Sequence, residues 1–149
     1  MMIRRLTEAD REIFLRLSEK FYGSDAVLHP IPDSYHAAAF DEMMRSDVYA
    51  DGFLIYNKDE IAGYAMTAKT YSHEAGGLTV WIEELYLLPE HRGQGLGHAF
   101  FAFAEEFYKG ALCRMRLETE PENERAEALY RSLGFEELGY RPFVKEFTK

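Results

Sequence analysis

The sequence predicts an α/β fold built as one domain over residues 1–149. Segments with the alternation of β-strands and segments with helical spacing follow one another along the chain, which is typical of this class. Residues 79–107 have the pattern of a strand, a glycine-rich turn and a helix in direct succession. A length of 149 residues and a hydrophobic fraction of 47% are enough for a core of its own.

The N-terminal part predicts a short strand and two helices. Residues 1–5 form the strand, and Thr7 followed by Asp10 has the spacing of a capping box at a helix start. A second helix is expected over residues 33–44, after a connector with two prolines. The apolar residues that recur at helical spacing in the first helix are Ile13, Phe14, Leu17 and Phe21.

The rest of the chain predicts more strands and two more helices. Strands are expected at 52–57 and 61–70, joined by a turn, and at 79–88 after a second polar turn. The predicted order of all elements is β-α-α-β-β-β-α-β-α-β-β. Its last members are a helix to about residue 109, a strand at 112–119, a helix between Asn123 and Gly134, and strands at 135–138 and 141–147.

The glycine-rich turn between the strand at 79–88 and its helix indicates an anion site. Backbone N–H groups at a helix N-terminus point toward an anion, and the helix dipole adds positive potential there. Glycines allow the backbone to approach a ligand closely. Residues 87–97 therefore predict a binding site for a phosphate or pyrophosphate group.

Two phosphate-binding patterns compete for this turn. The dinucleotide pattern G-x-G-x-x-G is met at its first two glycines but broken at His98, although Glu118 lies at about the spacing of its acidic residue. The pattern R-x-x-G-x-G is met in full by Arg92, Gly95 and Gly97. A glycine-rich helix start without any ligand is the third alternative.

The full match, preceded by Leu88-Pro89-Glu90, resembles the acetyl-CoA pyrophosphate loop of the GNAT family of N-acetyltransferases. The resemblance covers nearly the whole chain. It implies a single-domain fold with a mixed central sheet, splayed central strands and helices on both faces, and acetyl-CoA as co-substrate. The residues that it implies for CoA binding are Leu85, Tyr86, Leu87, Arg92, Gly93, Gln94, Gly95, Leu96, Gly97 and His98.

Glu83 and Glu84 are adjacent acids in the strand before the turn. Adjacent strand residues face opposite sides, so only one can face a given site unless a bulge re-aims the other. Residues 82–86 resemble the polyamine (spermidine/spermine) acetyltransferases, and the family has a bulge in this strand near the thioester. A carboxylate here would bind an ammonium group or accept its proton, and the resemblance favours Glu83 as the base. The alternative is that one glutamate is merely solvated.

Residues 123–135 resemble the family pattern N-x-x-A-x-x-L-Y-x-x-x-G-F. In that pattern the tyrosine hydroxyl lies near the CoA sulfur, which implies that Tyr130 donates a proton to the departing thiolate. A phenol with a pKa of about 10 is protonated at neutral pH and can do so. Asn123 is a plausible helix cap by residue type and, by resemblance, a ligand of the CoA arm. The alternative for Tyr130 is packing of its ring on the core.

The histidines and the cysteine predict no further chemistry. The five histidines show no close pair at a metal-ligand spacing, so we expect no metal site. His91 and His98 flank the glycine turn, where exposed loop positions are expected. Cys113 is expected to be buried in a strand, since free cysteines usually are.

The composition limits the partners and the location. A net charge of -9 argues against nucleic acid and against an anionic membrane surface, and it favours a cationic substrate. We see no signal peptide and no apolar run long enough to span a bilayer. With a single cysteine, a cytoplasmic location is expected. The formation of a homodimer is left open.

Together these patterns predict an acetyl-CoA-dependent N-acetyltransferase. The acceptor would be a primary amine of a small cationic molecule, attacking directly in a ternary complex. A catalytically silent CoA-binding regulatory module of the same fold is one alternative. A protein N-terminal or lysine acetyltransferase is another.

Overall fold

The computed structural model describes residues 2–147, which divide into two compact units. The first unit ends at Glu118 and the second begins at Thr119. The second unit contains the helix α4 (Glu124–Ser132). The elements of the first are β1 (Met2–Arg5), the 3-10 turn η1 (Glu8–Asp10), α1 (Arg11–Tyr22), α2 (Asp33–Arg45), β2 (Ala50–Asn57), β3 (Glu60–Ser72), β4 (Gly77–Leu87), the 3-10 turn η2 (Pro89–His91), α3 (Leu96–Phe107) and β5 (Leu112–Leu117).

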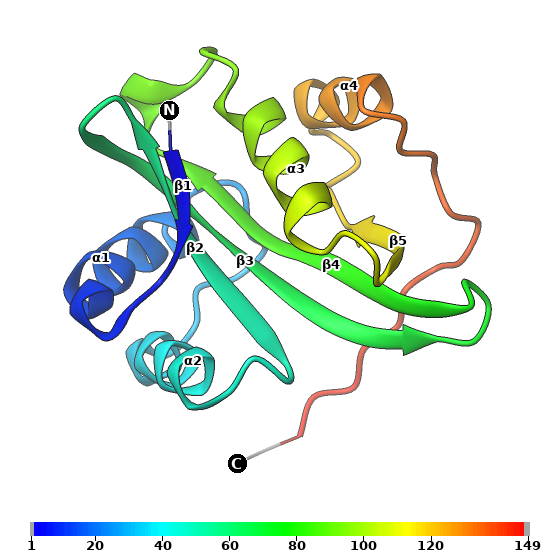
Figure 1. Ribbon diagram of the computed structural model, residues 1–149, viewed down its shortest axis with the longest axis horizontal. Coiled ribbons are helices and arrows are strands. Elements are labelled where there is room, and N and C mark those ends of the chain that lie inside the picture. Colours follow the sequence, from blue (N-terminus) through cyan, green and yellow to red (C-terminus); the bar gives the residue numbers. More distant parts are fainter. Residues whose placement is uncertain (1, 148–149) are drawn as a thin grey trace. The chain divides into compact units, whose positions relative to one another are not determined.

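The five strands form one mixed sheet in the order β1-β2-β3-β4-β5. From β1 to β4 each strand is antiparallel to the next, whereas β5 is parallel to β4. Parallel neighbours need a crossover, and α3 provides it (Figure 1). The predicted α/β class with a mixed sheet is confirmed.

Helices α1 and α2 cover one face of the sheet and α3 covers the other (Figure 1). The adjacent residues Phe53 and Leu54 of β2 show this division, because neighbouring strand residues point to opposite faces. Leu54 belongs to the core that Phe14 of α1 and Phe40 of α2 also form. The ring of Phe53 lies 5.3 Å from that of Phe103 in α3. Apolar burial on both faces therefore fixes the register of the sheet.

Asp10 fastens the first helix to the first strand. Its carboxylate accepts hydrogen bonds from the two guanidinium NH2 groups of Arg4, at 2.8 and 2.9 Å, and from the Thr7 backbone N–H at 2.7 Å. These contacts, Arg4 first, lower the pKa of Asp10 to about 2. The capping box predicted here is present, with an ion pair that joins it to β1.

In the second unit, α4 begins and ends at the predicted residues. The Asn123 side chain accepts a hydrogen bond from the Ala126 backbone N–H at 3.1 Å. Gly134 has a φ of 93°, and the Phe135 N–H beyond it donates to the Tyr130 carbonyl at 3.0 Å. This is the left-handed glycine ending that the sequence predicts.

The strands predicted at 135–138 and 141–147 are not formed, so this prediction was wrong. Large apolar side chains in the second segment are exposed, including Phe143 at 89% and Val144 at 82%. Aromatic and β-branched residues give a segment strand propensity, but a strand also needs a partner, which propensity does not supply.

Cys113 lies in β5 as predicted, but it is exposed rather than buried. β5 is an edge strand of the described sheet, with β4 as its neighbour. The sulfur lies over Gly77, where an added Cβ would come within 2.7 Å of it. Edge position explains the exposure.

Among residues 2–147, we find no helix whose length and apolar character would allow it to cross a membrane.

Candidate active site

The glycine turn forms a bend between β4 and α3. Gly93 and Gly95 have φ angles of 73° and 81°, in the left-handed region that favours glycine. Gly95 is the N-cap of α3, and the Ala99 N–H donates to its carbonyl at 3.0 Å. The amides of the first helical turn before Ala99 therefore have no intrahelical partner. A Cβ at Gly95 would meet nothing within 4 Å, so the bend opens onto free space.

Arg92 closes the end of β4. Its Nε donates to the Leu87 carbonyl at 2.9 Å, and its guanidinium carbon lies 5.7 Å from the centre of the Tyr86 ring. Arg92 and Gln94 are exposed, as binding residues must be. Leu96 is only 1% exposed, so its side chain belongs to the core and its backbone alone could contact a ligand.

His91 differs from its prediction. It is 7% exposed instead of lying open in the loop, and its ring nitrogens contact Asn57 and Glu60. His98, in the first turn of α3, is exposed as expected. Within residues 2–147 no three His, Cys, Asp or Glu side chains come together in a way that could hold a metal ion.

β4 loses its parallel partner half-way along its length. Pairing with β5 ends where Ile82 lies opposite Leu117, whereas β4 continues to Leu87. Leu85 and Tyr86 pair with β3 on one side, and no strand of the described residues flanks them on the other. The backbone groups that the family resemblance assigns to the CoA arm thus lie along a free strand edge.

A β-bulge lies at the two acids. Met66 of β3 pairs with Glu84, but its neighbour Thr67 pairs with Ile82. Glu83 is therefore the extra residue of the bulged strand. Because one residue is skipped, Ile82 and Glu84 point to opposite faces although they are two positions apart.

Hydrogen bonds on the two faces agree with this shift. On the α3 face, the Thr67 hydroxyl, opposite Ile82, lies 2.7 Å from the Tyr108 hydroxyl. On the α1 face, the Glu84 carboxylate accepts from the hydroxyls of Tyr22 and Tyr64, each at 2.6 Å. One phenol contacts each carboxylate oxygen of Glu84, which fixes the orientation of this charge.

Glu83 has a different environment. It is exposed, and it makes no hydrogen bond or ion pair with residues 2–147. Partial desolvation, followed by the charges of Glu84 and Glu118, raises the pKa of Glu83. Burial and both acids raise the pKa of Tyr22. Both carboxylates are therefore close enough to Tyr22 to interact with it, which simple strand alternation would not allow.

Sequence reasoning missed Tyr22 and Tyr64. Burial and the neighbouring Glu84 raise the pKa of both phenols, so both stay protonated as donors. Tyr22 ends α1 and carries no motif of its own. Tyr64 lies two residues before Met66 on β3, so a known bulge register would have placed it beside Glu84.

Asn123 and Tyr130 lie in the second unit. Burial raises the pKa of the Tyr130 phenol, which therefore remains protonated at neutral pH. Its ring lies 6.0 Å from that of Phe135. Of the predicted site residues, only these two belong to that unit.

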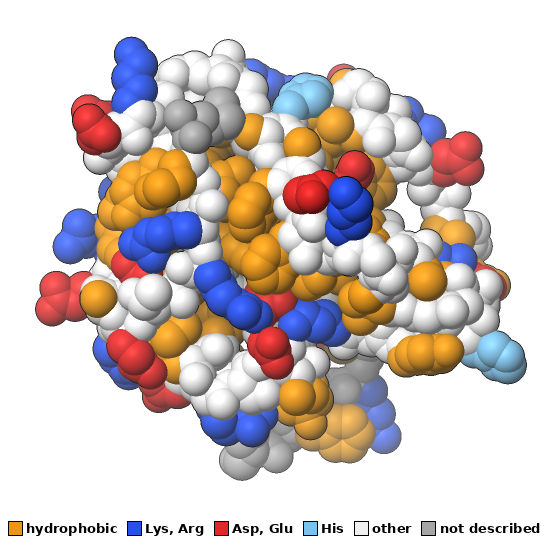
Figure 2. Space-filling view, in the orientation of Figure 1, with side chains coloured by type: hydrophobic (Ala, Val, Ile, Leu, Met, Phe, Trp, Pro, Cys, Tyr) orange, Lys and Arg blue, Asp and Glu red, His pale blue; other side chains and the backbone are white. Residues whose placement is uncertain are grey.

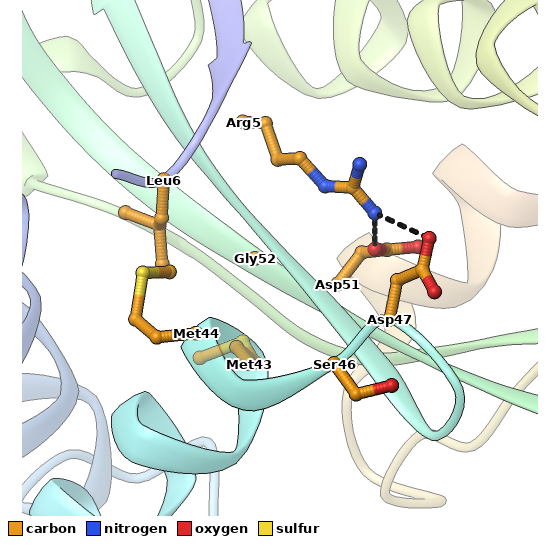
Figure 3. A pocket seen from close by; sticks show the side chains of 8 residues that line it. All are labelled: Arg5, Leu6, Met43, Met44, Ser46, Asp47, Asp51 and Gly52. Atoms are coloured by element: carbon orange, nitrogen blue, oxygen red, sulfur yellow. Dashed lines mark hydrogen bonds and ion pairs between the residues drawn. The ribbon is translucent and has the colours of Figure 1, made fainter. Parts of the chain in front are cut away.

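A pocket of about 300 Å³ at the start of β2 contains none of the predicted site residues (Figure 3). Arg5 reaches across it to Asp51 and, at 3.5 Å, to Asp47. The residues that line it are Arg5, Leu6, Met43, Met44, Ser46, Asp47, Asp51 and Gly52.

Asp51 is the centre of a saturated polar cluster at this pocket. Its buried carboxylate also accepts from Tyr108 at 2.6 Å and pairs with Lys69 Nζ at 2.8 Å. Burial alone would raise the pKa of Asp51, but hydrogen bonds from Lys69, Tyr108 and Arg5 lower it. On the surface, Lys and Arg side chains also lie beside Asp and Glu side chains (Figure 2). The polar groups of the Asp51 cluster bond to one another, and these bonds join β1, β2 and β3 to the end of α3.

Comparison with known proteins decides the family. The model of the acetyltransferase (GNAT) family matches residues 12–135. The chain belongs to the acetyltransferase (GNAT) family. This confirms the family prediction, and the glycine turn and the acid pair are the candidate site of this GNAT-family chain.

The curated relatives are distant or partial. An uncharacterised protein of Mycobacterium leprae (strain TN) is 32% identical over 150 residues, which covers 95% of this chain and 36% of that protein. Thialysine N-epsilon-acetyltransferase of Bos taurus is 33% identical over 79 residues, 52% of this chain and 46% of that protein. This chain therefore spans between about a third and a half of the length of these relatives.

Solved structures share the fold. A possible acetyltransferase from Clostridium difficile 630 has a TM-score of 0.82 at 19% identity, covering 99% of this chain and 98% of that one. An aminoglycoside N-acetyltransferase in complex with CoA has a TM-score of 0.78 at 23% identity, covering 97% and 93%. At these identities the likeness establishes the GNAT fold of this chain.

Proposed function

We propose that this chain is an acetyl-CoA-dependent N-acetyltransferase that acetylates a primary amine of a small cationic molecule. The observation that carries the proposal is the bulged acid pair on β4, placed where β4 leaves β5 and ahead of an open glycine turn. Two chemical requirements meet on this one strand: a carboxylate for an ammonium group, and a free edge and helix start for an anionic coenzyme.

The residues of the turn fit the coenzyme. The bend opens onto free space at Gly95, and the unpaired amides of the first turn of α3 can donate to a pyrophosphate. The backbone of Leu85 to Leu87 would hold the pantetheine arm along the free edge of β4, with His98 and Asn123 as further ligands by family resemblance. Bound acetyl-CoA supplies the thioester acyl group.

Glu83 is the proposed base. Its exposed carboxylate pairs with no side chain of residues 2–147, and its raised pKa makes it a better proton acceptor than an ordinary glutamate. It would bind the ammonium form of the substrate and take its proton before the amine attacks. Glu84, held by two phenols, contributes a fixed negative charge beside it. The amine then attacks the thioester directly, without an acyl-enzyme.

Tyr130 is the proposed proton donor to the departing sulfur. Its phenol is protonated at neutral pH, and the motif around it is that of the family tyrosine. The proposal includes both units, with residues 1–149 acting as one acetyltransferase domain.

The names of the similar proteins support an amine acceptor. One relative is a thialysine N-epsilon-acetyltransferase, and among similar structures are aminoglycoside N-acetyltransferases. Both names describe acetyl transfer to nitrogen. Together with the net charge of -9 and the resemblance of residues 82–86 to polyamine acetyltransferases, they favour a di- or polyamine.

The test is an acceptor screen with the wild-type chain. Acetyl-CoA is incubated with a diamine, a polyamine, an amino sugar and a peptide with a free N-terminus, and thiol release is followed beside the mass of the product. We expect amine-dependent thiol release, fastest with the di- or polyamine. CoA binding without thiol release on any amine would instead indicate a silent regulatory module, and preference for the peptide would indicate a protein acetyltransferase.

A further inference from the structure

The last residue of β2, directly before the turn into β3, makes side-chain contacts to the glycine turn. The Asn57 side-chain amide donates to Gln94 Oε1 at 2.8 Å, and the Gln94 amide donates to the Glu90 backbone carbonyl at 3.1 Å. The same Asn57 nitrogen lies 3.2 Å from Nδ1 of the buried His91. One residue of the β2–β3 hairpin thus contacts both His91 and Gln94, the two residues that flank Arg92 and Gly93.

The direction of this chain of hydrogen bonds is fixed by its last member. A backbone carbonyl can only accept, so the amide nitrogen of Gln94 must face Glu90. The Gln94 oxygen is then turned to Asn57, and Asn57 must present its own nitrogen. Rotating the Asn57 amide by half a turn would set two oxygens against each other.

The second hydrogen of the Asn57 amide determines the state of His91. The His91 Nδ1 can accept it only when that nitrogen carries no proton, which leaves the proton on Nε2. Nε2 lies 3.4 Å from a carboxylate oxygen of Glu60, which is suited to receive it. Each of these polar side chains therefore has one role, and Asn57 donates to both Gln94 and His91.

We propose that Asn57 is a positioning residue for the coenzyme: it holds the glycine turn in its anion-binding shape through Gln94 and His91. The inference rests on the proposed function, because it concerns the same CoA site. Asn57 itself touches neither reactant. A pre-shaped turn binds its ligand more tightly, since the cost of ordering the loop has been met in folding.

The measurement is CoA affinity by calorimetry in the absence of amine. We expect Asn57→Ala to raise the Kd for CoA about tenfold. At saturating acetyl-CoA its kcat should equal that of the wild type, because the reacting groups are untouched. Asp59→Ala, in the turn that follows Asn57 but without a contact to the loop, is the matched control and should bind CoA normally.

A double-mutant cycle separates positioning from general support of the fold. If Asn57 acts through Gln94, then Asn57→Ala should raise the Kd less than about threefold in a Gln94→Ala background, because couplings appear only between interacting residues. If the alanine variant unfolds at a lower temperature than the wild type, Asn57→Ser is used in its place. The serine hydroxyl is too short to reach Gln94, so we expect the same rise in the Kd for CoA.

The outcomes are distinct. A wild type that binds CoA, with Asn57→Ala binding equally well, overturns this inference alone. A double-mutant cycle in which the effects of the two substitutions on the Kd multiply in full also overturns it. A wild type that binds no CoA removes the proposed function, and this inference with it.

Discussion

At the scale of single residues, two neighbouring glutamates have unequal surroundings. Glu84 accepts a phenol hydrogen bond on each oxygen, whereas Glu83 is exposed and has its pKa raised by partial desolvation and by Glu84 and Glu118. The sequence could predict an acid pair and its chemistry, and strand alternation could predict that the two differ. It could not predict the partners of Glu84, because Tyr22 and Tyr64 come from separate elements and carry no motif.

The two acids should therefore respond differently to the same substitution. We expect Glu83→Gln to lower kcat/KM for a diamine about a hundredfold through loss of the base. Glu84→Gln should cost less than about tenfold, since the amide oxygen still accepts from one phenol and the amide nitrogen can donate to the oxygen of the other. The measurement is initial rate against diamine concentration at saturating acetyl-CoA. Equal activity of both variants and the wild type would leave the pair without a catalytic role.

The direction in which kcat/KM changes with pH can be predicted for the wild type and for the same two variants. A carboxylate must be ionised to accept a proton, so wild-type kcat/KM should fall as the pH drops through the raised pKa of Glu83. Glu83→Gln should lack this acid limb, whereas Glu84→Gln should keep it.

Tyr130→Phe tests the proton donor. Loss of a general acid lowers kcat about a hundredfold when leaving-group protonation limits the rate. CoA affinity by calorimetry should not change, because the ring remains. Tyr49→Phe, the same substitution at an exposed tyrosine, is the control and should be fully active. A Tyr130→Phe variant that turns over at the wild-type rate would make Tyr130 a packing residue only.

At the scale of elements, the glycine turn was the easiest part to predict. Its glycines, its arginine and the helix behind it are all local in the sequence, and local sequence determines helix starts and left-handed bends. The support from the β2–β3 hairpin was not predictable, because Asn57 and His91 are brought together by the sheet. The burial of His91 follows from that contact and was missed for the same reason.

Gly95 provides the test of the turn. Valine at a φ of 81° is strained, and its side chain would fill the space where a pyrophosphate is expected. We expect Gly95→Val to weaken CoA binding about tenfold or more, measured by calorimetry. Gly110→Val is the matched control, because Gly110 also has a positive φ, of 90°, and open space around its Cβ, but lies after α3. Equal losses in both variants would assign the effect to backbone strain.

At the scale of the whole molecule, the sequence predicted the α/β class from the alternation of strand and helix patterns along the chain. The family and the mixed sheet were predicted from its resemblance to the GNAT family, whose motifs lie in residues 82–135. Prediction failed for residues 135–147, where short apolar segments gave strand propensity without a partner. Cys113 was misplaced on similar grounds: its strand was right, but its position at an edge was not visible in the sequence.

The net charge of -9 predicts that the reaction with a cationic amine depends on the salt concentration. The field of an acidic protein attracts a cationic amine, and salt screens that attraction. At saturating acetyl-CoA, kcat/KM for a diamine should fall severalfold when the ionic strength rises from about 0.01 M to about 0.5 M. A monoamine of the same length should be less affected, since it carries one charge. A diamine rate insensitive to salt would mean that overall charge does not select the substrate.

The order of the strands has a consequence for the chain as it leaves the ribosome. Tyr22, Tyr64 and both acids precede the end of β4, and β2, β3 and β4 are joined by short turns that close quickly. α3 and β5 are synthesised later, and β5 must return across α3 to reach its place beside β4. We therefore expect the acid pair and its two tyrosines to assemble on the nascent chain before the glycine turn and the helix behind it have been synthesised.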